Sequence, residues 1–365
     1  MKKNIYFFIG TTAELIKLAP VIRELQTRKI AFKIITSGQN KILFRELRKY
    51  LGPLKADIAF GEKKETSSVF WFALWAIKTF FVGLLLLRKE LSGLNQDNSY
   101  FIVHGDTVSS LIGALIAYIY GLKIVHIEAG LRSFSFLEPF PEEFCRVIIS
   151  YLVDIHFCPN KWCIDNLSKR RGVKVNTSQN TLIETLEMVL QSRSRQEKFQ
   201  RLGKYLVLVV HRQEHVVLRK TLAKRMLKSV LDNLPADLAC VLIGHKLTLR
   251  FLESTGLIVE MRERKNIIIL PRLPYTEFVE LLIKAECLIT DGGSNQEEAY
   301  FLGKPCLLLR NRTERIEGLN SNVVLSRGKE EVVRSFLKNY QRYKKEKVRF
   351  SKAPSRIIVD YLLKH

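Results

Sequence analysis

The chain has 365 residues, which is too long for one ordinary hydrophobic core and predicts two domains. Its apolar content of 47% and charged content of 26% are globular values and exclude a disordered protein. The net charge of +23 predicts attraction to an anion, such as nucleic acid, an acidic membrane surface or a phosphorylated small molecule. Nucleic acid is excluded first, because no RNA-binding or helix-turn-helix signature and no stacking platform is present.

The six cysteines form no C-x-x-C pair, and most lie inside apolar runs, where a thiol behaves as a small hydrophobe. This usage indicates a reduced, cytoplasmic protein. The N-terminus is basic like a signal peptide, but its apolar run is short and breaks at Thr11. We therefore interpret the first apolar run, Ile5 to Ile9, as a strand.

Gly10 follows this strand, and an amphipathic helix is predicted from Glu14 to Leu25. A strand, glycine turn and helix present amides and a positive helix end to an anion, so Gly10 and Lys17 are candidate binding residues. The alternative for Lys17 is a solvated helix lysine. The next strand, Phe32 to Thr36, ends in a polar exit that makes Gln39 a further candidate.

The segment from Ser68 to Leu87 is nearly as long and as apolar as a membrane span. Lys78 lies in its middle, where insertion costs roughly 2.5–3.5 kcal/mol. The strand at 101–103 is also expected in the same sheet as the first strand. A membrane span between them would place the two strands on opposite sides of the membrane. We expect a helix in contact with a membrane surface, with a buried or subunit-interface helix and a true span as alternatives. Basic residues on both sides of the segment suit anionic head groups.

Three acids mark the candidate catalytic site. Asp106 follows the strand at 101–104, Glu128 follows the strand at 123–127, and Glu142 lies in the P-E-E sequence beyond. Ligand sites in open α/β sheets gather at such strand ends, so Asp106 and Glu128 are expected at one rim. A loop acid is usually only solvated, but two consecutive strand ends with glycine flanks favour a site.

The second half repeats the alternation of strand and helix, with strands predicted at 205–210, 239–243, 267–270, 287–289 and, as the last strand, 306–309. This alternation predicts an α/β fold with two doubly wound, Rossmann-like parallel sheets that face each other across a cleft. We expect the first domain at 1–170 with a C-terminal helix at about 350–365, and the second at 171–349. The connection between them is expected at 171–201.

The sequence D-G-G-S-N-Q-E-E, from Asp291 to Glu298, lies between a strand and a helix. Two glycines permit close backbone approach, and free amides at a helix start suit a pyrophosphate. Glutamates in a first helical turn are also ordinary dipole complements, although Glu298 is suited to holding ribose hydroxyls. The basic residues expected near the same site are Arg310, Arg312 and Arg315. His211 ends the strand at 205–210 and is either a cleft residue or a structural histidine.

Together these motifs resemble the non-hydrolysing UDP-N-acetylglucosamine 2-epimerase family from Gly10 to about Gly318. The matching motifs are G-T-x-x-E-x-I-K-x-A-P-V-I (Gly10 to Ile22), H-G-D-T (His104 to Thr107), H-I-E-A-G-L-R-S (His126 to Ser133), P-F-P-E-E-x-x-R (Pro139 to Arg146), H-R-x-E (His211 to Glu214), T-D-G-G-S-N-Q-E-E (Thr290 to Glu298), L-G-K-P (Leu302 to Pro305) and T-E-R-x-E-G (Thr313 to Gly318).

The resemblance implies a B-type glycosyltransferase fold, a homodimer, and interconversion of UDP-GlcNAc and UDP-ManNAc for cell-surface polysaccharide precursors. UDP is eliminated to a glycal intermediate and added back, without a metal or nicotinamide cofactor. The implied catalytic residues are Asp106, Glu128, Glu142 and His211. The implied contacts to the UDP-sugar are Gly10, Lys17, Gln39, Arg146, Gly293, Ser294, Glu298 and Arg315. These roles agree with the chemistry, since C–H abstraction needs a base and the departing UDP needs electrostatic help.

Two motifs depart from the family pattern. Thr12 stands where the family has an arginine that helps to hold UDP, and the serine of the glycine-rich loop stands at position 294 instead of 292. These changes affect nucleotide contacts and sugar identity and leave the acids intact. The main alternative is therefore a membrane-associated glycosyltransferase of the same fold with a lipid-linked acceptor. A hydrolysing epimerase and a non-catalytic binding protein are weaker alternatives.

Overall fold

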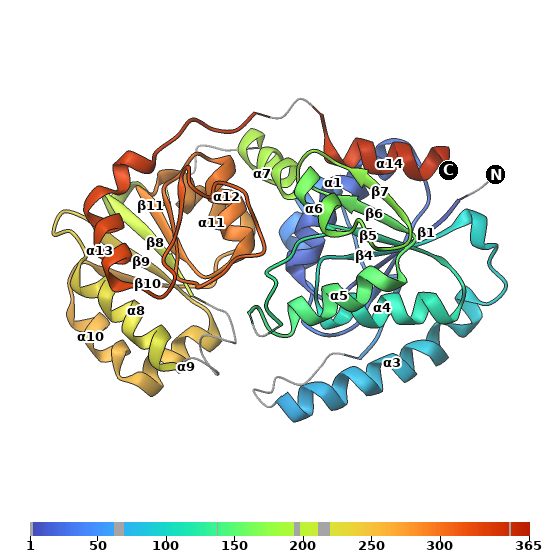
Figure 1. Ribbon diagram of the computed structural model, residues 1–365, viewed down its shortest axis with the longest axis horizontal. Coiled ribbons are helices and arrows are strands. Elements are labelled where there is room, and N and C mark those ends of the chain that lie inside the picture. The colour runs from blue at the N-terminus through green and yellow to red at the C-terminus, as the bar shows by residue number, and fades with distance from the viewer. Residues whose placement is uncertain (1–2, 62–68, 137, 193–197, 211–219, 350–351) are drawn as a thin grey trace. The chain divides into compact units, whose positions relative to one another are not determined.

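The computed structural model describes residues 3–61, 69–136, 138–192, 198–210, 220–349 and 352–365. The chain forms two compact units (Figure 1). The first comprises residues 1–136, 141–185 and 350–365, and the second comprises residues 137–140 and 186–349. Each unit has its own parallel sheet and hydrophobic core.

The first unit contains a seven-stranded parallel sheet in the order β3-β2-β1-β4-β5-β6-β7. Its strands are β1 (Asn4–Ile9), β2 (Lys33–Thr36), β3 (Ile58–Ala59), β4 (Ser99–His104), β5 (Lys123–Ile127), β6 (Ile155–Cys158) and β7 (Val173–Asn176). The central strands are buried on both faces, which explains why they are continuous apolar runs and do not alternate.

Helices cover both faces of this sheet. The helices of this unit are α1 (Thr12–Thr27), α2 (Arg48–Leu51), α3 (Val69–Leu91), α4 (Val108–Ile119), α5 (Glu142–Leu152), α6 (Lys161–Asn166) and α14 (Pro354–Lys364), and α7 (Leu182–Gln191) begins in this unit and ends in the second. Side chains of α3, α4 and α5 share one core cluster with the sheet. Helices α1 and α14 pack against each other on the opposite face (Figure 1). The C-terminal helix α14 is held there by the Ser355 hydroxyl, which donates to Glu184 at 2.6 Å.

The second unit contains a six-stranded parallel sheet in the order β10-β9-β8-β11-β12-β13. Its strands are β8 (Tyr205–Val209), β9 (Ala239–Gly244), β10 (Ile267–Pro271), β11 (Cys287–Thr290), β12 (Cys306–Leu308) and β13 (Val323–Leu325). Its helices are α8 (Lys220–Asp232), α9 (Lys246–Thr255), α10 (Leu257–Glu263), α11 (Tyr275–Lys284), α12 (Gly293–Phe301) and α13 (Glu330–Asn339). One core cluster includes α8, α9, α10 and α13, and the other includes α11 and α12.

The predicted fold class, α/β with two doubly wound parallel sheets, is confirmed. Three short edge strands were not predicted, namely β3, β7 and β13, so the strand at 306–308 is not the last. Because β7 pairs with β6, residues 171–185 lie in the first unit and do not form a connection after residue 170. Between residue 329 and the C-terminus the chain forms two separate helices, α13 and α14.

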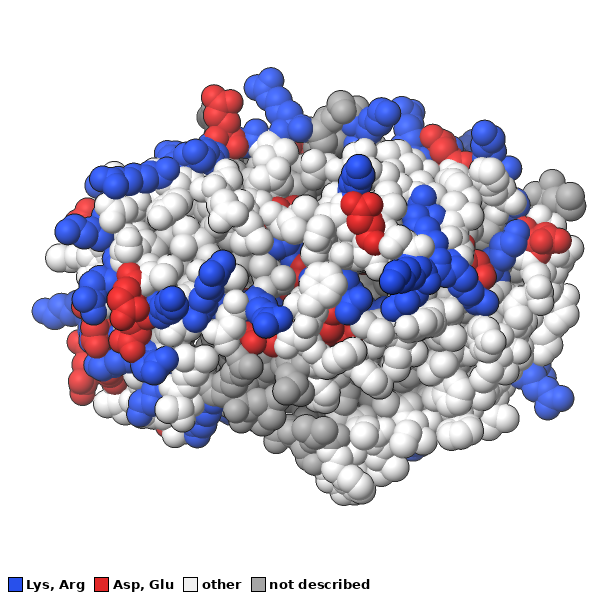
Figure 2. Space-filling model, in the orientation of Figure 1, with Lys and Arg blue, Asp and Glu red and all other residues white. Residues whose placement is uncertain are grey.

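Helix α3 passes a length and hydropathy test for a membrane span over Phe70–Leu91. One such helix is weak evidence for a span, and only 17% of its most apolar window is buried. Its buried residues are Thr79, Gly83, Leu87 and Leu91, which face the core of the first unit. The expected apolar helix is present, and a large part of its surface is exposed. In Figure 2 the edge of the first unit where α3 lies carries few charged side chains.

Gly130 fixes the turn after β5 that carries Glu128. Its φ is +85°, and a Cβ there would lie 2.2 Å from the carbonyl oxygen of Cys163. Gly130→Ala should therefore lower the free energy of unfolding by roughly 2–5 kcal/mol, because left-handed strain adds to a clash with backbone. Denaturant unfolding measures the change.

Gly93→Ala is the matched control, because Gly93 has a φ of +81° and no atom within 4 Å of an added Cβ. We expect it to cost only the conformational strain of about 1–2 kcal/mol. Equal losses for the two variants would contradict the close approach at Gly130.

Candidate functional site

Glu128 is the centre of a buried polar cluster at the end of β5. Its carboxylate accepts hydrogen bonds from Lys17 Nζ at 2.9 and 2.8 Å and from Asn180 Nδ2 at 2.6 Å. His104 Nε2 lies 3.6 Å from the same carboxylate. The Lys17 and Glu128 side chains are only 9% and 2% exposed. Glu128 also has a φ of +67°, a conformation that a non-glycine residue rarely adopts and that directs its side chain into this cluster.

Asp106, at the end of β4, is held by a chain of charges. Arg146 on α5 donates to Asp106 and to Glu143. Glu143 is fully buried and also accepts from Arg132 Nε at 2.7 Å and from the Ser133 amide at 3.1 Å. Burial alone would raise the pKa of Glu143, but Arg146, Arg132 and the amide outweigh it and the pKa is lowered. Arg146 is therefore held in place by Glu143 through one nitrogen and donates through the other to Asp106, whose side chain remains 25% exposed.

Glu142 lies in the first turn of α5, where a carboxylate is favoured by the helix dipole. Burial raises the pKa of the neighbouring Cys145 thiol, and the charges of Asp106 and Glu142 raise it further. The charges of Asp106 and Glu128 in turn both act on His104 and His126. Asp106 and Glu128 thus lie at the ends of neighbouring strands, near the same two histidines, and the shared role of the three acids stays a prediction.

Two buried histidines lie beneath these acids. Burial lowers the pKa of His104 to about 3 and that of His126 to about 4, so both are neutral near pH 7. His126 Nε2 lies 2.7 Å from the Gly105 carbonyl oxygen, an acceptor that makes this nitrogen the protonated one. His126 thereby holds the turn that carries Asp106.

The turn at Gly10 differs from the expected anion cradle. Glu14 accepts the amides of Gly10 at 2.5 Å and Thr11 at 2.9 Å, and the hydroxyl of Thr107 at 2.6 Å. These two amides are therefore occupied by a carboxylate of the chain itself. Burial raises the pKa of Glu14, and the four hydrogen bonds that it accepts only partly oppose the rise.

Gly10, Lys17 and Gln39 therefore hold the chain's own groups. A Cβ at Gly10 would lie 2.1 Å from Ser109 Oγ, so glycine permits the close approach of α1 and α4. Gln39 Oε1 accepts from the Ser109 amide at 3.0 Å and from its hydroxyl at 2.7 Å. Lys17 is neither solvated nor open to an anion, because it is ion-paired with Glu128. Their expected contacts to a ligand stay predictions.

The glycine-rich loop of the second unit begins α12 at Gly293, and no side chain caps this helix start. A Cβ at Gly293 would lie 2.6 Å from Glu314 Oε1 and 2.8 Å from Arg315 Nε, so the side chains of both residues pack over the turn. Arg315 is fixed by Glu297 at 2.7 Å, and Glu298 accepts from Asn295 Nδ2 at 2.9 Å. An uncapped helix start beside an oriented arginine suits a phosphate group, with the half-buried Ser294 in its first turn.

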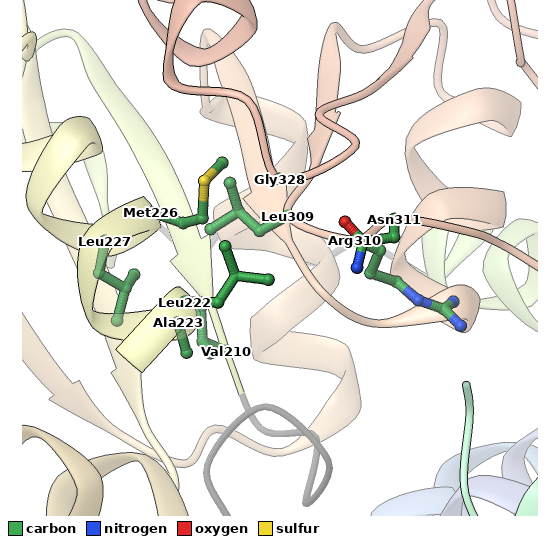
Figure 3. Close-up of a pocket in the computed structure, with 9 residues that line it drawn as sticks. All are labelled: Val210, Leu222, Ala223, Met226, Leu227, Leu309, Arg310, Asn311 and Gly328. Atoms are coloured by element: carbon green, nitrogen blue, oxygen red, sulfur yellow. The ribbon is translucent and has the colours of Figure 1, made fainter. Parts of the chain in front are cut away.

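Arg310 and Arg312 were expected near the same loop. Arg310 is 1% exposed and lies 2.8 Å from Glu314, whose carboxylate packs against Gly293, so Arg310 lies near the loop, and Arg312 is exposed. Arg310 is one of the residues that line a small pocket at the ends of β8 and β12. In Figure 3 its side chain points away from the apolar side chains of Leu222 and Met226. The pocket is lined by Val210, Leu222, Ala223, Met226, Leu227, Leu309, Arg310, Asn311 and Gly328.

Two further features of the site concern His211 and metal ligands. His211 and the rest of its H-R-x-E motif lie outside the described residues. Within the described ranges, no group of three or more His, Cys, Asp or Glu side chains is arranged to hold a metal ion.

Comparison with known proteins identifies the family. The sequence profile described as UDP-N-acetylglucosamine 2-epimerase matches residues 82–356, which is more than half of the chain. The chain belongs to the UDP-N-acetylglucosamine 2-epimerase family. A UDP-N-acetylglucosamine 2-epimerase of Methanococcus maripaludis is 32% identical over 350 residues, which cover 90% of each protein. A Pseudomonas aeruginosa relative, a UDP-2,3-diacetamido-2,3-dideoxy-D-glucuronate 2-epimerase, is 30% identical over 69% of this chain and 71% of its own.

A solved structure agrees with this assignment. The UDP-GlcNAc 2-epimerase of Methanocaldococcus jannaschii, crystallised with UDP-GlcNAc and UDP, superposes with a TM-score of 0.86 and 25% identity. The match covers 99% of each chain. The predicted architecture, that of B-type glycosyltransferases, is therefore confirmed.

Sequence reasoning missed Asn180 and the support given by Glu143 and Glu14. Asn180 lies just beyond β7, in a segment that was interpreted as a connection between domains. A polar residue after a strand was the signal, but the strand itself was too polar to recognise. Glu143 was missed because the P-E-E motif was assigned to Glu142. Consecutive helix residues face different directions, so the two glutamates have different surroundings.

Glu143→Ala should lower the free energy of unfolding by about 3–5 kcal/mol, because it leaves Arg146 and Arg132 without their buried carboxylate. Thermal or denaturant unfolding measures the loss. Glu143→Gln keeps the shape and acceptor oxygen and should cost less than alanine. Unchanged stability in the alanine variant would contradict the role of this carboxylate.

His126 provides a pH prediction. Its folded pKa of about 4 lies below the ordinary 6.5, so the unfolded chain binds the proton first as pH falls. The stability contributed by neutral His126 is full above about pH 6.5 and is lost as pH falls toward about 4. The difference in unfolding free energy between the wild type and His126→Gln should therefore shrink between pH 7 and pH 5. A constant difference would contradict a buried neutral histidine.

Proposed function

We propose that this protein interconverts UDP-GlcNAc and UDP-ManNAc, or a close UDP-HexNAc pair, for polysaccharide precursor synthesis. The supporting observation is that, in a chain of this family, Asp106 and Glu128 follow the neighbouring strands β4 and β5 and Glu142 lies in the first turn of α5. The sugar is removed from UDP with loss of the C2 proton, and UDP is added back after a proton returns to the opposite face of C2.

The surroundings of the three acids support different tasks. Glu128 is only 2% exposed and already accepts from Lys17 and Asn180, which suits a fixed charge. Asp106 is 25% exposed, and Glu142 is half-buried, which suits direct contact with the sugar. We assign the transfer of the C2 proton to Asp106 and Glu142, with Glu128 supporting the charge that develops. Positioned acids and bases of this kind typically contribute 10²–10⁴-fold.

The second unit carries the proposed nucleotide contacts. Gly293, Ser294 and Arg315 would hold the pyrophosphate, and Glu298 the ribose hydroxyls. The uncapped helix start, the packing of Arg315 on Gly293 and the burial of Glu298 support these roles. The M. jannaschii relative, crystallised with UDP-GlcNAc and UDP, supports the same class of ligand. The P. aeruginosa relative, which acts on a diacetamido glucuronate, shows how the sugar varies among relatives.

A glycosyltransferase with a lipid-linked acceptor is the second candidate. The exposed apolar face of α3 and the net charge of +23 favour it. The two functions differ in one requirement, since the epimerase acts on the UDP-sugar alone and the transferase needs an acceptor.

We also propose a cytoplasmic location, supported by six buried free thiols, and a homodimer, as the family resemblance implies. Contact with a membrane surface through residues 68–87 is also proposed, supported by the exposed apolar side chains in the described part of α3.

Incubation of the purified protein with UDP-GlcNAc in heavy water tests the reaction. We expect UDP-ManNAc to appear and deuterium to enter at C2 in both sugars, as followed by NMR. Asp106→Asn and Glu142→Gln should each lower kcat by roughly 10²–10⁴-fold and retain UDP binding. Asp97→Asn is the control, because the Asp97 side chain is 85% exposed. Release of free UDP, or no turnover until an acceptor is added, would sink the proposal.

A further inference from the structure

The Glu14 carboxylate is bound by the starts of two helices. Thr11 and Glu14 form a capping box at the start of α1, in which one carboxylate oxygen accepts the amides of Thr11 at 2.9 Å and Gly10 at 2.5 Å. A capping box needs no further contact. The second oxygen nevertheless reaches α4, where it accepts from the hydroxyls of Thr107 at 2.6 Å and Ser110 at 3.1 Å. Glu14 therefore joins two helices whose starts are far apart in the sequence.

The contact lies at a special place in the first sheet. Helices α1 and α4 follow the neighbouring strands β1 and β4 and cover opposite faces of the sheet (Figure 1). The strand order therefore reverses between β1 and β4, and the ligand crevices of open α/β sheets form at such a point. Glu14 bridges the two helix starts at this point.

Thr107 connects Glu14 to the candidate site. It is the N-cap of α4, and its hydroxyl accepts the Ser110 amide at 3.0 Å while it donates to Glu14. It also follows Asp106 directly in the chain. Because the Thr107 side chain is held on two sides, the backbone next to Asp106 is held as well.

This arrangement uses a buried charge where a neutral side chain would complete the cap. Glu14 is 4% exposed, its hydrogen bonds come from amides and hydroxyls, and Lys17, one turn later on α1, is paired with Glu128. Glutamine would also cap α1 and would avoid the cost of burying a charge. Only a carboxylate, however, has two acceptor oxygens. Holding two helix starts requires both.

We propose that Glu14 is a positioning residue for proton transfer at C2 of the sugar, because it fixes the turn at 105–107 that carries Asp106. This inference rests on the proposed function, in which Asp106 transfers that proton. His126 holds the start of the turn, Glu14 holds its end, and Arg146 binds the Asp106 carboxylate. A displacement of about 1 Å at a reacting group can slow a reaction roughly 10²-fold.

Glu14→Gln tests the inference, because it keeps the size of the side chain and leaves one acceptor oxygen for two helix starts. We expect kcat for UDP-GlcNAc to fall about 10- to 100-fold, with the Kd of UDP changed by less than about twofold. Thr107→Val should lower kcat similarly, and Thr107→Ser should retain it, since serine keeps the hydroxyl. In the double variant Glu14→Gln, Thr107→Val, the loss should be much smaller than the product of the single losses, because both changes remove one contact.

Amide hydrogen exchange follows the turn without turnover. In Glu14→Gln and in Thr107→Val, a peptide that spans residues 104–110 should exchange faster than in the wild type, and a peptide from β6 should exchange at the same rate. A wild-type protein that does not convert UDP-GlcNAc would contradict the proposed function alone. The exchange measurement would still decide whether Glu14 fixes the turn.

Glu184→Gln is the matched control in the same unit. The Glu184 carboxylate also accepts an amide and a hydroxyl, those of Ser355 at 2.7 and 2.6 Å, and burial likewise raises its pKa. Because it holds α14 and not a turn of the site, its loss should lower stability and leave kcat within about twofold of the wild type. Unchanged kcat in Glu14→Gln, an equal loss in Glu184→Gln, multiplying losses in the double variant or unchanged exchange at 104–110 would each overturn the inference.

Discussion

A carboxylate buried in the first unit constrains the arrangement around it. Glu128 is 2% exposed as a side chain, so its charge has to be matched by Lys17 and Asn180 at hydrogen-bonding distance. That requirement fixes α1, which carries Lys17, and the residues after β7, which carry Asn180, against the end of β5. It also explains why a non-glycine residue is kept at a φ of +67°. The strain is small beside the cost of leaving a buried charge without partners.

Buried ion pairs also occur along the edges of both sheets. Arg146 lies between Asp106 and Glu143, and in the second unit Arg315 lies beside Glu297 on α12. In each unit a helix start and a buried ion pair fix a guanidinium next to a turn. Such pairs contribute little net stability by themselves, but they set geometry well because either partner is costly to remove. This is what a site needs when it has to support charge that appears only during reaction.

The sequence was sufficient for the fold class and for placing Asp106 and Glu128 at strand ends, because buried parallel strands are continuous apolar runs and these two acids follow them directly. It was not sufficient for their partners. Lys17 and Glu128 are separated by 111 residues, and neither periodicity nor motif specifies that distant pair. Lys17 therefore remained ambiguous between solvent and an anion. Glu14 was also missed as an acceptor of the Gly10 turn, although Thr11 and Glu14 have the spacing of a capping box, whereas its hydrogen bonds from Thr107 and Ser110 depend on tertiary packing.

Helix α3 shows the limit of composition most clearly. Its hydropathy satisfies the test for a membrane span, but its glycine and two of its leucines pack in the core of the first unit. Hydropathy sums over both faces of a helix, whereas function depends on which face is already covered. The covered face of α3 needs Gly83 for close packing and Glu90 for contact with Lys33, while its outer face meets no such demand. Apolar residues retained on a face that the fold does not need are best explained by a contact outside the unit.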